Sequence, residues 1–294
     1  MTWFDRQGTV IGRASDPGGF RDAALSPDGT RAVVSRTNPQ DTAKADLWLL
    51  DLVRGGGATR LTLGTGIAES PVWSPDGKRI IFTFGNSRLR QKLASGEGDE
   101  EDMLRVTSAG GVTASGWSRD GRFLLYTAGD TSTNLRDLWV LQRNDLKAVP
   151  FLRTAFDESQ GRFSPDGRWV AYISNQSGLN EVYVKRFTAD FSGGSGSAGG
   201  GVLVSRGGGT APRWRGDGRE LFYLAPNGKM MAVQVKPGQE FDAGSPAALF
   251  ETPIGAIFDD VTADGKRFLL TAPVGPSSSA PFTVLLNWTA GLKK

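Results

Sequence analysis

Polar side chains that could do chemistry recur in this chain at similar places ahead of a repeated Asp-Gly turn. Carboxylates dominate the set, and two carboxylates that face one another at about 5–9.5 Å can carry out glycoside chemistry. A ring of carboxylates could instead hold Ca²⁺, which takes oxygen ligands. The candidate residues for binding a ligand or partner are Arg21, Asp22, Glu69, Ser70, Asp157, Glu158, Gln160, Arg213, Asp259 and Asp260.

The 294 residues include neither histidine nor cysteine. This composition excludes the usual Ser-His-Asp triad, thiolate catalysis, disulfides and most zinc sites. Any enzymatic chemistry would therefore rest on carboxylates, and the pairing to test is Asp157 or Glu158 opposite Asp22 or Asp260. The alternative for the same residues is a solvated polar channel with local ion pairs, which we favour. We assign no catalytic residue and no metal ligand.

A repeat positions these residues. The motif around Ser74-Pro75-Asp76-Gly77 returns in six related copies between short apolar strands. The aspartates of the six turns are Asp28, Asp76, Asp120, Asp166, Asp217 and Asp264. Intervals of 48, 44, 46, 51 and 47 residues separate them. A period of about 40–50 residues is typical of one four-stranded blade of a β-propeller.

The sequence therefore predicts an all-β fold: one six-bladed β-propeller of four-stranded antiparallel blades over residues 1–294. The serine, proline, aspartate and glycine of the motif suit a type I turn followed by a left-handed residue. The aromatic residue before the turn, such as Trp73, is expected to pack between blades. In this fold the ten candidate residues lie at the mouth of the central channel. A seven-bladed propeller in a longer parent chain is the alternative.

The two ends of the chain are expected to complete one blade together. The sixth repeat supplies first and second strands, and residues 282–288 are expected to form its third strand. Residues 1–13 resemble a third and a fourth strand with no first and second strand before them. We expect residues 1–13, through Thr9–Gly12 and also Trp3–Asp5, to close the ring by pairing with 282–288.

The repeat resembles the TolB-like, WD40-like propellers of bacteria. It is most similar to the C-terminal propeller of membrane serine/threonine protein kinases of the acidobacterial type. The resemblance covers essentially the whole chain, and the stretches that carry it are residues 2–8, 46–52, 71–80, 161–187, 212–236 and 284–294. In such kinases the propeller would lie outside the cytoplasmic membrane as a sensor or interaction module. The chain has no kinase motifs, so the resemblance transfers no kinase activity.

We therefore expect a non-catalytic binding or sensor module, either the extracytoplasmic part of a receptor-kinase-like protein or a stand-alone TolB-like protein. The alternative is a propeller hydrolase or lyase that uses a carboxylate pair in the channel mouth. A propeller that gates a serine peptidase is a third reading, although no α/β-hydrolase domain is recognisable. No cofactor is expected, apart from the calcium ion considered above.

The expected partner is a protein, a peptide or a small molecule at the channel face, bound by a monomer. The formal charge of only +3 does not indicate nucleic-acid binding. No segment is apolar over the length that a membrane span requires. The expected location is periplasmic for a part of a membrane-anchored parent. The chain alone, without a recognisable signal peptide, would be cytoplasmic.

Overall fold

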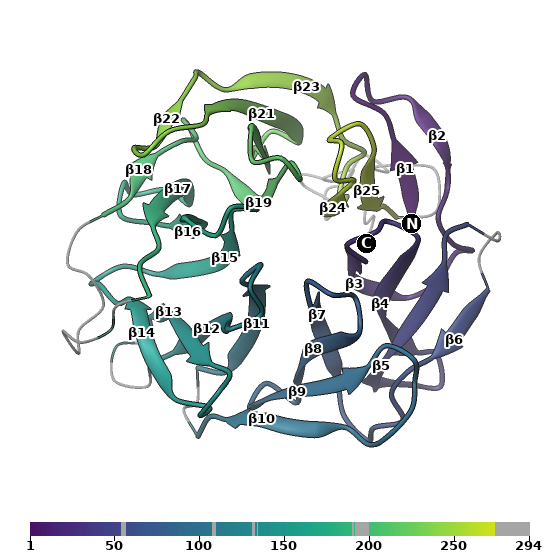
Figure 1. The fold of residues 1–294 in the computed structure, drawn as a ribbon. Helices are drawn as coiled ribbons and strands as arrows, with labels where there is room; N and C mark the ends of the chain where they lie inside the picture. Colours follow the sequence, from purple (N-terminus) through teal and green to yellow (C-terminus); the bar gives the residue numbers. More distant parts are fainter. Residues whose placement is uncertain are drawn as a thin grey trace, which may run out of the picture.

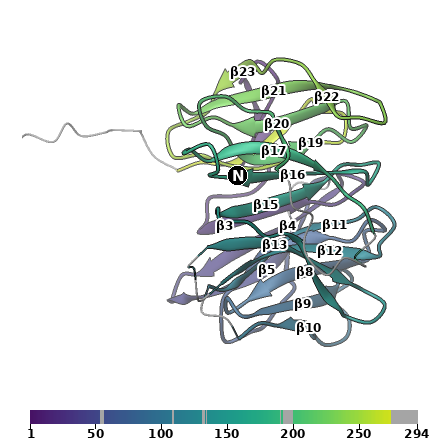
Figure 2. The ribbon, with the colours of Figure 1, turned by 90° about the vertical axis from the view of Figure 1, so that its left-hand side faces the viewer.

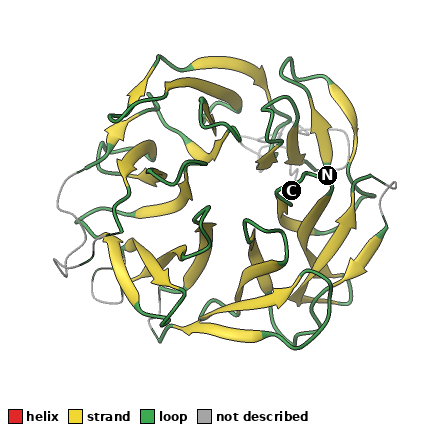
Figure 3. Cartoon of the chain, viewed as in Figure 1, coloured by secondary structure: helices red, strands yellow, loops and turns green. Residues whose placement is uncertain are grey.

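The computed structural model describes residues 1–53, 57–107, 110–130, 133, 135–189, 191 and 200–273. Their strands form six sheets arranged as a ring around a central axis (Figure 1). Seen from the side, the ring is thinner than it is wide (Figure 2). The described residues are strands, turns and loops without helices (Figure 3), and none of them forms a helix able to cross a membrane. The predicted six-bladed propeller of antiparallel sheets is thus confirmed.

Blades 1 to 3 each contain four consecutive strands. Blade 1 consists of β3 (Phe20–Leu25), β4 (Arg31–Asn38), β5 (Asp41–Asp51) and β6 (Ala58–Arg60). Blade 2 consists of β7 (Ala68–Trp73), β8 (Arg79–Phe84), β9 (Arg88–Leu93) and β10 (Glu101–Arg105). Blade 3 consists of β11 (Val112–Trp117), β12 (Phe123–Gly129), β13 (Arg136–Gln142) and β14 (Ala148–Leu152).

Blades 4 to 6 are less regular. Blade 4 consists of β15 (Glu158–Phe163), β16 (Trp169–Ser174), β17 (Glu181–Arg186) and β18 (Val202–Leu203). Blade 5 consists of β19 (Thr210–Trp214), β20 (Glu220–Leu224) and β21 (Lys229–Lys236), with both β22 (Asp242–Ala243) and β23 (Ala247–Glu251) paired to β21. Blade 6 consists of β24 (Ile257–Val261), β25 (Phe268–Thr271), β1 (Thr2–Phe4) and β2 (Val10–Arg13).

The repeated turn has the local chemistry that its residues predict. In blade 2 the hydroxyl of Ser74 donates to the carboxylate of Asp76 at 2.5 Å, and Gly77 follows with a φ of 67°. That left-handed conformation suits glycine because it has no Cβ. Four other blades have the same hydroxyl-to-aspartate bond. Blade 5 replaces the hydroxyl with Arg215, which pairs with Asp217 at 3.2 Å.

The hydrophobic core is divided into six clusters, one at each interface between neighbouring blades. Second strands supply residues to two clusters at once, because their alternate side chains point to opposite faces. Phe82 of β8, for example, packs towards blade 1, whereas Ile81 packs towards blade 3. Each blade therefore needs both of its neighbours to bury its faces.

The N-terminal strand closes the ring. β1 pairs antiparallel with β25, so that Trp3 lies opposite Leu269 and Phe4 opposite Phe268, and β2 pairs with β1. β1 thus occupies the third place of blade 6, beside β25, which we had assigned to residues 282–288. Trp3 and Phe4 continue the alternating apolar faces of β25, which favours this position. Residues 282–288 lie outside the described residues.

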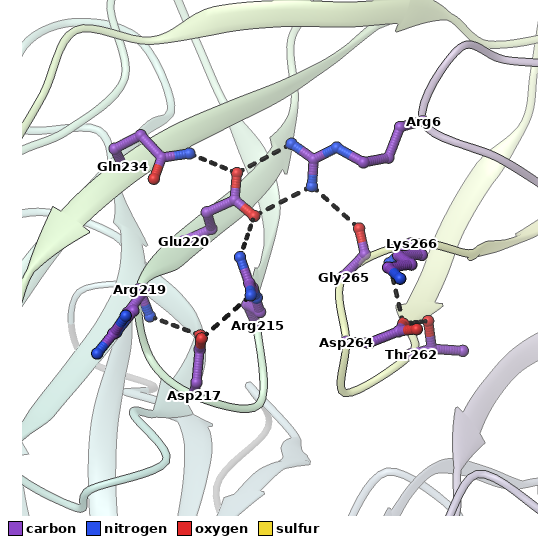
Figure 4. A network of polar contacts seen from close by, with 10 residues as sticks. All are labelled: Arg6, Arg215, Asp217, Arg219, Glu220, Gln234, Thr262, Asp264, Gly265 and Lys266. Atoms are coloured by element: carbon purple, nitrogen blue, oxygen red, sulfur yellow. Dashed lines mark hydrogen bonds and ion pairs between the residues drawn. The ribbon is translucent and has the colours of Figure 1, made fainter.

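A polar network fastens the N-terminal segment to blades 5 and 6 (Figure 4). Arg6 donates two hydrogen bonds to the carboxylate of Glu220, at 2.9 and 3.0 Å, and a third to the carbonyl of Gly265 at 3.0 Å. Arg215 and Gln234 also donate to Glu220. Burial disfavours the ionised carboxylate of Glu220, but these donors outweigh burial and lower its pKa. The ring closure is therefore electrostatic as well as apolar.

Candidate functional site

The inner strands β3, β7, β11, β15, β19 and β24 surround the central channel (Figure 1), and every one of them carries a bulge. In three strands the bulge places a residue other than glycine in the left-handed region, at Ser70, Gln160 and Ala211, with φ between 52° and 54°. Bulges redirect the side chains and amides around them, and such backbone strain often accompanies a functional site. The channel wall is therefore shaped differently from an ordinary strand surface.

Polar side chains use these bulges to connect neighbouring blades. The amide of Ser70 donates to Asp22 of blade 1 at 2.7 Å, and the amide of Ala211 donates to Gln160 of blade 4 at 2.8 Å. A third hydrogen bond of this kind joins blades 1 and 6, because the amide of Leu25 donates to the carboxylate of Asp260 at 2.9 Å. Four of the predicted site residues, Asp22, Ser70, Gln160 and Asp260, thus have a structural role in joining blades.

Two adjoining cavities fill the channel. The entry half, about 270 Å³, lies among the starts of the inner strands. The turn half, about 280 Å³, lies among their ends, next to the Asp-Gly turns. Three charged residues line both halves, and we call them the waist: Arg162, Arg213 and Asp259. Asp22 lines the entry half, and Trp73, Trp117, Phe163 and Trp214 line the turn half.

Asp259 is the most unusual group at the waist. The residue is only 2% exposed, and neither carboxylate oxygen makes a hydrogen bond of good geometry among the described residues, although the hydroxyl and the amide of Thr271 lie close enough to stabilise its charge. Burial, together with the nearby charge of Asp22, raises its pKa to about 7, although Thr271 offsets part of this effect. Asp22 itself has one unpartnered oxygen, and burial raises its pKa to about 6 despite the amide of Ser70.

The two arginines at the waist are held differently. Arg213 donates to the carbonyls of Asp259 and Pro212 at 2.8 and 2.9 Å, and its Nε lies 3.8 Å from a carboxylate oxygen of Asp260. Arg162 makes one long hydrogen bond of 3.3 Å to the carbonyl of Gly161. No carboxylate of the described residues lies within ion-pair distance of Arg162. Burial and the neighbouring Arg213 lower the pKa of Arg162 to about 9.

The structure divides the ten predicted residues into two groups. Six line the channel cavities: Asp22, Ser70, Gln160, Arg213, Asp259 and Asp260. The other four do not. Arg21 and Glu69 form an ion pair of 3.0 Å, in which both side chains are partly exposed.

The carboxylate pair proposed for catalysis is not assembled. Asp157 is ion-paired with Arg136, whose Nε lies 2.8 Å from it. Glu158 is buried and accepts hydrogen bonds from the hydroxyls of Thr154 and Ser174, at 2.6 and 3.3 Å. Burial raises the pKa of Glu158 to about 7, but neither acid lines the channel cavities. The acids that influence one another in the channel are instead Asp22 and Asp259.

Sequence reasoning missed Arg162. A signal was present, because Arg162 and Arg213 each stand directly before the aromatic residue that precedes a repeat turn, in Arg162-Phe163 and Arg213-Trp214. Equivalent positions in two successive blades place the two guanidinium groups side by side in the channel. Only the repeat register, rather than residue type, could have identified Arg162.

A calcium ring was the alternative considered for the channel carboxylates, next to the polar channel with ion pairs that we favoured. Within the part of the chain that the structure describes, no three acidic side chains come together in a way that could hold a metal ion. Asp22 and Asp259 lie near Arg213, whose positive charge opposes the binding of a cation.

The fold and the channel define a six-bladed β-propeller with a polar interior. The TolB beta propeller domain matches residues 13–191, and the chain belongs to this family. A putative TolB from Agrobacterium tumefaciens has a similar structure, with a TM-score of 0.66 and 17% identity over 90% of this chain and 94% of the other. Oligogalacturonate lyase from Vibrio parahaemolyticus shares the fold, with a TM-score of 0.58 and 12% identity over 90% of this chain and 75% of the other.

Two curated relatives are named as peptidases. Dipeptidyl-peptidase 5 of Porphyromonas endodontalis is 39% identical over 209 residues, which cover 54% of this chain. The uncharacterized peptidase YuxL of Bacillus subtilis is 29% identical over 193 residues, or 52% of this chain. This chain spans 29% of the length of each relative. The matched part therefore leaves most of each relative without a counterpart here.

The raised pKa of Asp259 predicts a pH dependence of stability. An acid whose pKa is higher in the folded than in the unfolded state destabilises the fold as the pH rises between those values. For Asp259 this interval runs from about 4 to about 7. The melting temperature should fall between pH 5 and pH 8, and Asp259→Asn should reduce that fall by a few degrees. Differential scanning calorimetry at both pH values tests this, with the exposed Glu240→Gln as control. Equal falls in the two variants would contradict it.

Proposed function

We propose that this chain is a non-catalytic binding module that receives a ligand in its central channel. The observation that carries the proposal is the waist, where the guanidinium of Arg162 has no carboxylate within ion-pair distance among the described residues and the carboxylate oxygens of Asp259 make no hydrogen bond of good geometry. A buried polar group without a hydrogen bond costs free energy, so a ligand that satisfies it gains affinity. Binding sites commonly combine a preformed cavity with a few convergent polar groups.

We further propose that the module works outside the cytoplasmic membrane. It would act as the sensing part of a receptor-kinase-like protein or as a stand-alone TolB-like protein. The resemblance of the repeats to the propeller half of such kinases supports this proposal, together with membership of the TolB propeller family. The ligand would be a peptide or a small molecule, or the end of a protein chain that enters the channel.

The test compares two substitutions at Gln160, whose side chain lines the entry half and is exposed. Gln160→Trp fills the cavity, whereas Gln160→Ala removes the same side-chain contact without filling it. Thermal unfolding is measured against a panel of short peptides, monosaccharides and galacturonate oligomers. A ligand that prefers the folded state raises the melting temperature in a saturable manner. We expect such a rise in the wild type and in Gln160→Ala, but at least tenfold weaker binding in Gln160→Trp.

A second candidate function is catalysis. Acids with a pKa near the working pH are suited to proton transfer, and burial raises the pKa of Asp22 and Asp259 to about 6 and about 7. The names of the peptidase and lyase relatives also favour this candidate. Mass spectrometry of the same panel after prolonged incubation separates the two functions. Substrate turnover that Asp259→Asn abolishes would replace the binding proposal, and intact ligands would support it.

A further inference from the structure

The unpartnered oxygens of Asp259 indicate the first chemical requirement of the ligand. Asp259 lines the space shared by the two channel halves, and both of its carboxylate oxygens are buried acceptors. One oxygen of the neighbouring Asp22 is equally unpartnered. A ligand group that meets them must donate several hydrogen bonds from a small volume. An ammonium group, with three donors and a positive charge, has this property.

Arg162 indicates the second requirement. Its guanidinium group carries five N–H donors in a planar fork, and the structure accounts for only one long hydrogen bond. Arginine forks bind carboxylates by two parallel hydrogen bonds. The adjacent Arg213 adds positive potential at the same place, since it lowers the pKa of Arg162. A ligand carboxylate satisfies this part of the waist.

The charge balance of the waist disfavours a ligand with a single charge. An anion would approach Arg162 and Arg213 but would also meet Asp22 and Asp259. A cation would meet the opposite conflict. A neutral molecule that separates a positive and a negative group matches both and leaves the net charge of the buried site unchanged. This property defines a zwitterion.

The turn half supplies the third requirement. Trp73, Trp117 and Trp214 line it, and each indole N–H already donates to a backbone carbonyl, at 3.0, 3.1 and 3.2 Å. These rings therefore offer apolar surface to a ligand rather than hydrogen bonds. A cavity of about 280 Å³ beside the waist accommodates an apolar side chain.

We infer that the waist binds the zwitterion of an apolar amino acid or of a short apolar peptide. The ligand carboxylate lies on Arg162, the ammonium group lies on Asp259 and Asp22, and an apolar side chain enters the turn half. This inference rests on the proposed binding function and specifies its ligand. Free amino acids and short peptides share this chemistry, and the experiment distinguishes them.

Titration of the full chain by calorimetry tests the inference with chemical probes. L-leucine and L-leucyl-L-leucine carry both charges, whereas 3-methylbutylamine lacks the carboxylate and 4-methylpentanoate lacks the ammonium group. We expect leucine or its dipeptide to bind in a saturable manner. The tighter ligand of the two shows whether the site takes a free amino acid or a short peptide. Both single-charge analogues should bind at least tenfold more weakly, and glycine should bind more weakly than leucine. Single-charge analogues that bind as tightly as leucine would overturn the inference.

Matched variants locate the site. Arg162→Gln and Asp259→Asn should each weaken leucine or dileucine binding about 10- to 100-fold, the effect expected for losing hydrogen bonds to a charged group. The control variants Arg219→Gln and Glu240→Gln make the same changes of charge at exposed positions outside the channel. Their affinity for leucine or dileucine should stay within twofold of that of the wild type. Unchanged binding in Arg162→Gln would also overturn the inference. Because the analogues are compared on the wild type, a variant that fails to fold leaves the test intact.

Failure of this inference is distinguishable from failure of the proposed function. If a sugar or a longer peptide of the panel binds and Gln160→Trp blocks it, the channel is a binding site, but not for a small zwitterion. If no probe of either experiment binds, both proposals fall.

Discussion

Deletion of residues 1–13 is expected to lower the free energy of unfolding by about 5 kcal/mol or more, because it removes several large buried side chains. Trp3 and Met1 belong to the apolar cluster between blades 6 and 1, and Phe4 belongs to the cluster between blades 5 and 6. The deletion also removes Arg6 from the buried carboxylate of Glu220. Since a domain is typically stable by only 5–15 kcal/mol, the deletion should remove a large fraction of the stability of the protein.

Urea denaturation followed by tryptophan fluorescence measures this effect. The control keeps the segment but replaces Val10 and Ile11 of β2 by serine, since both side chains are exposed, at 59% and 48%. The control substitutions should lower the free energy of unfolding by less than about 1 kcal/mol, as surface substitutions usually do. A truncated chain with the same transition midpoint as the full chain would disprove closure of the ring by the N-terminal strand.

Phe268→Ala is expected to lower the free energy of unfolding by about 3–5 kcal/mol, the range for removing a fully buried aromatic side chain. Phe268 is 0% exposed and packs edge-on against the rings of Phe222 and Phe250, with centroids 5.1 and 5.4 Å away. It also lies opposite Phe4 in the pairing of β25 with β1. The substitution therefore affects the ring closure and the interface of blades 5 and 6 together.

Phe268→Leu is the matched comparison, because leucine keeps most of the apolar volume and should cost less than about 1.5 kcal/mol. Equilibrium urea unfolding of both variants gives the difference. Equal costs for alanine and leucine would mean that the apolar volume kept by leucine restores no stability, and would contradict this prediction.

The sequence allowed the fold to be predicted because its decisive signals are local. Ser74, Asp76 and Gly77 build their turn from neighbouring residues alone, and the same turn recurs with a blade-length period. The partner of the N-terminal strand was harder to predict, because pairing of β1 with β25 joins segments at opposite ends of the described chain. Apolar alternation indicated a strand but not its neighbour.

The site was predicted less completely, because channel position depends on the bulges and on distant partners. Glu158 and Asp157 have the right residue type and place in the repeat, but Thr154 and Arg136 engage them, and neither acid lines the cavities. Arg162 was missed because arginine before an aromatic residue resembles an exposed strand end. Its enclosure becomes evident only when six inner strands are placed around one axis.

The pairing of Thr2 with Leu270 also sets an order of events during synthesis on the ribosome. β1 is made first, but its partner β25 emerges only after blades 1 to 5 have been translated. Until then the growing chain is an open arc, with the apolar faces of blades 1 and 5 uncovered at its two ends. Incomplete chains that expose such surface are prone to aggregate. This protein should therefore depend on chaperones until translation has passed β25.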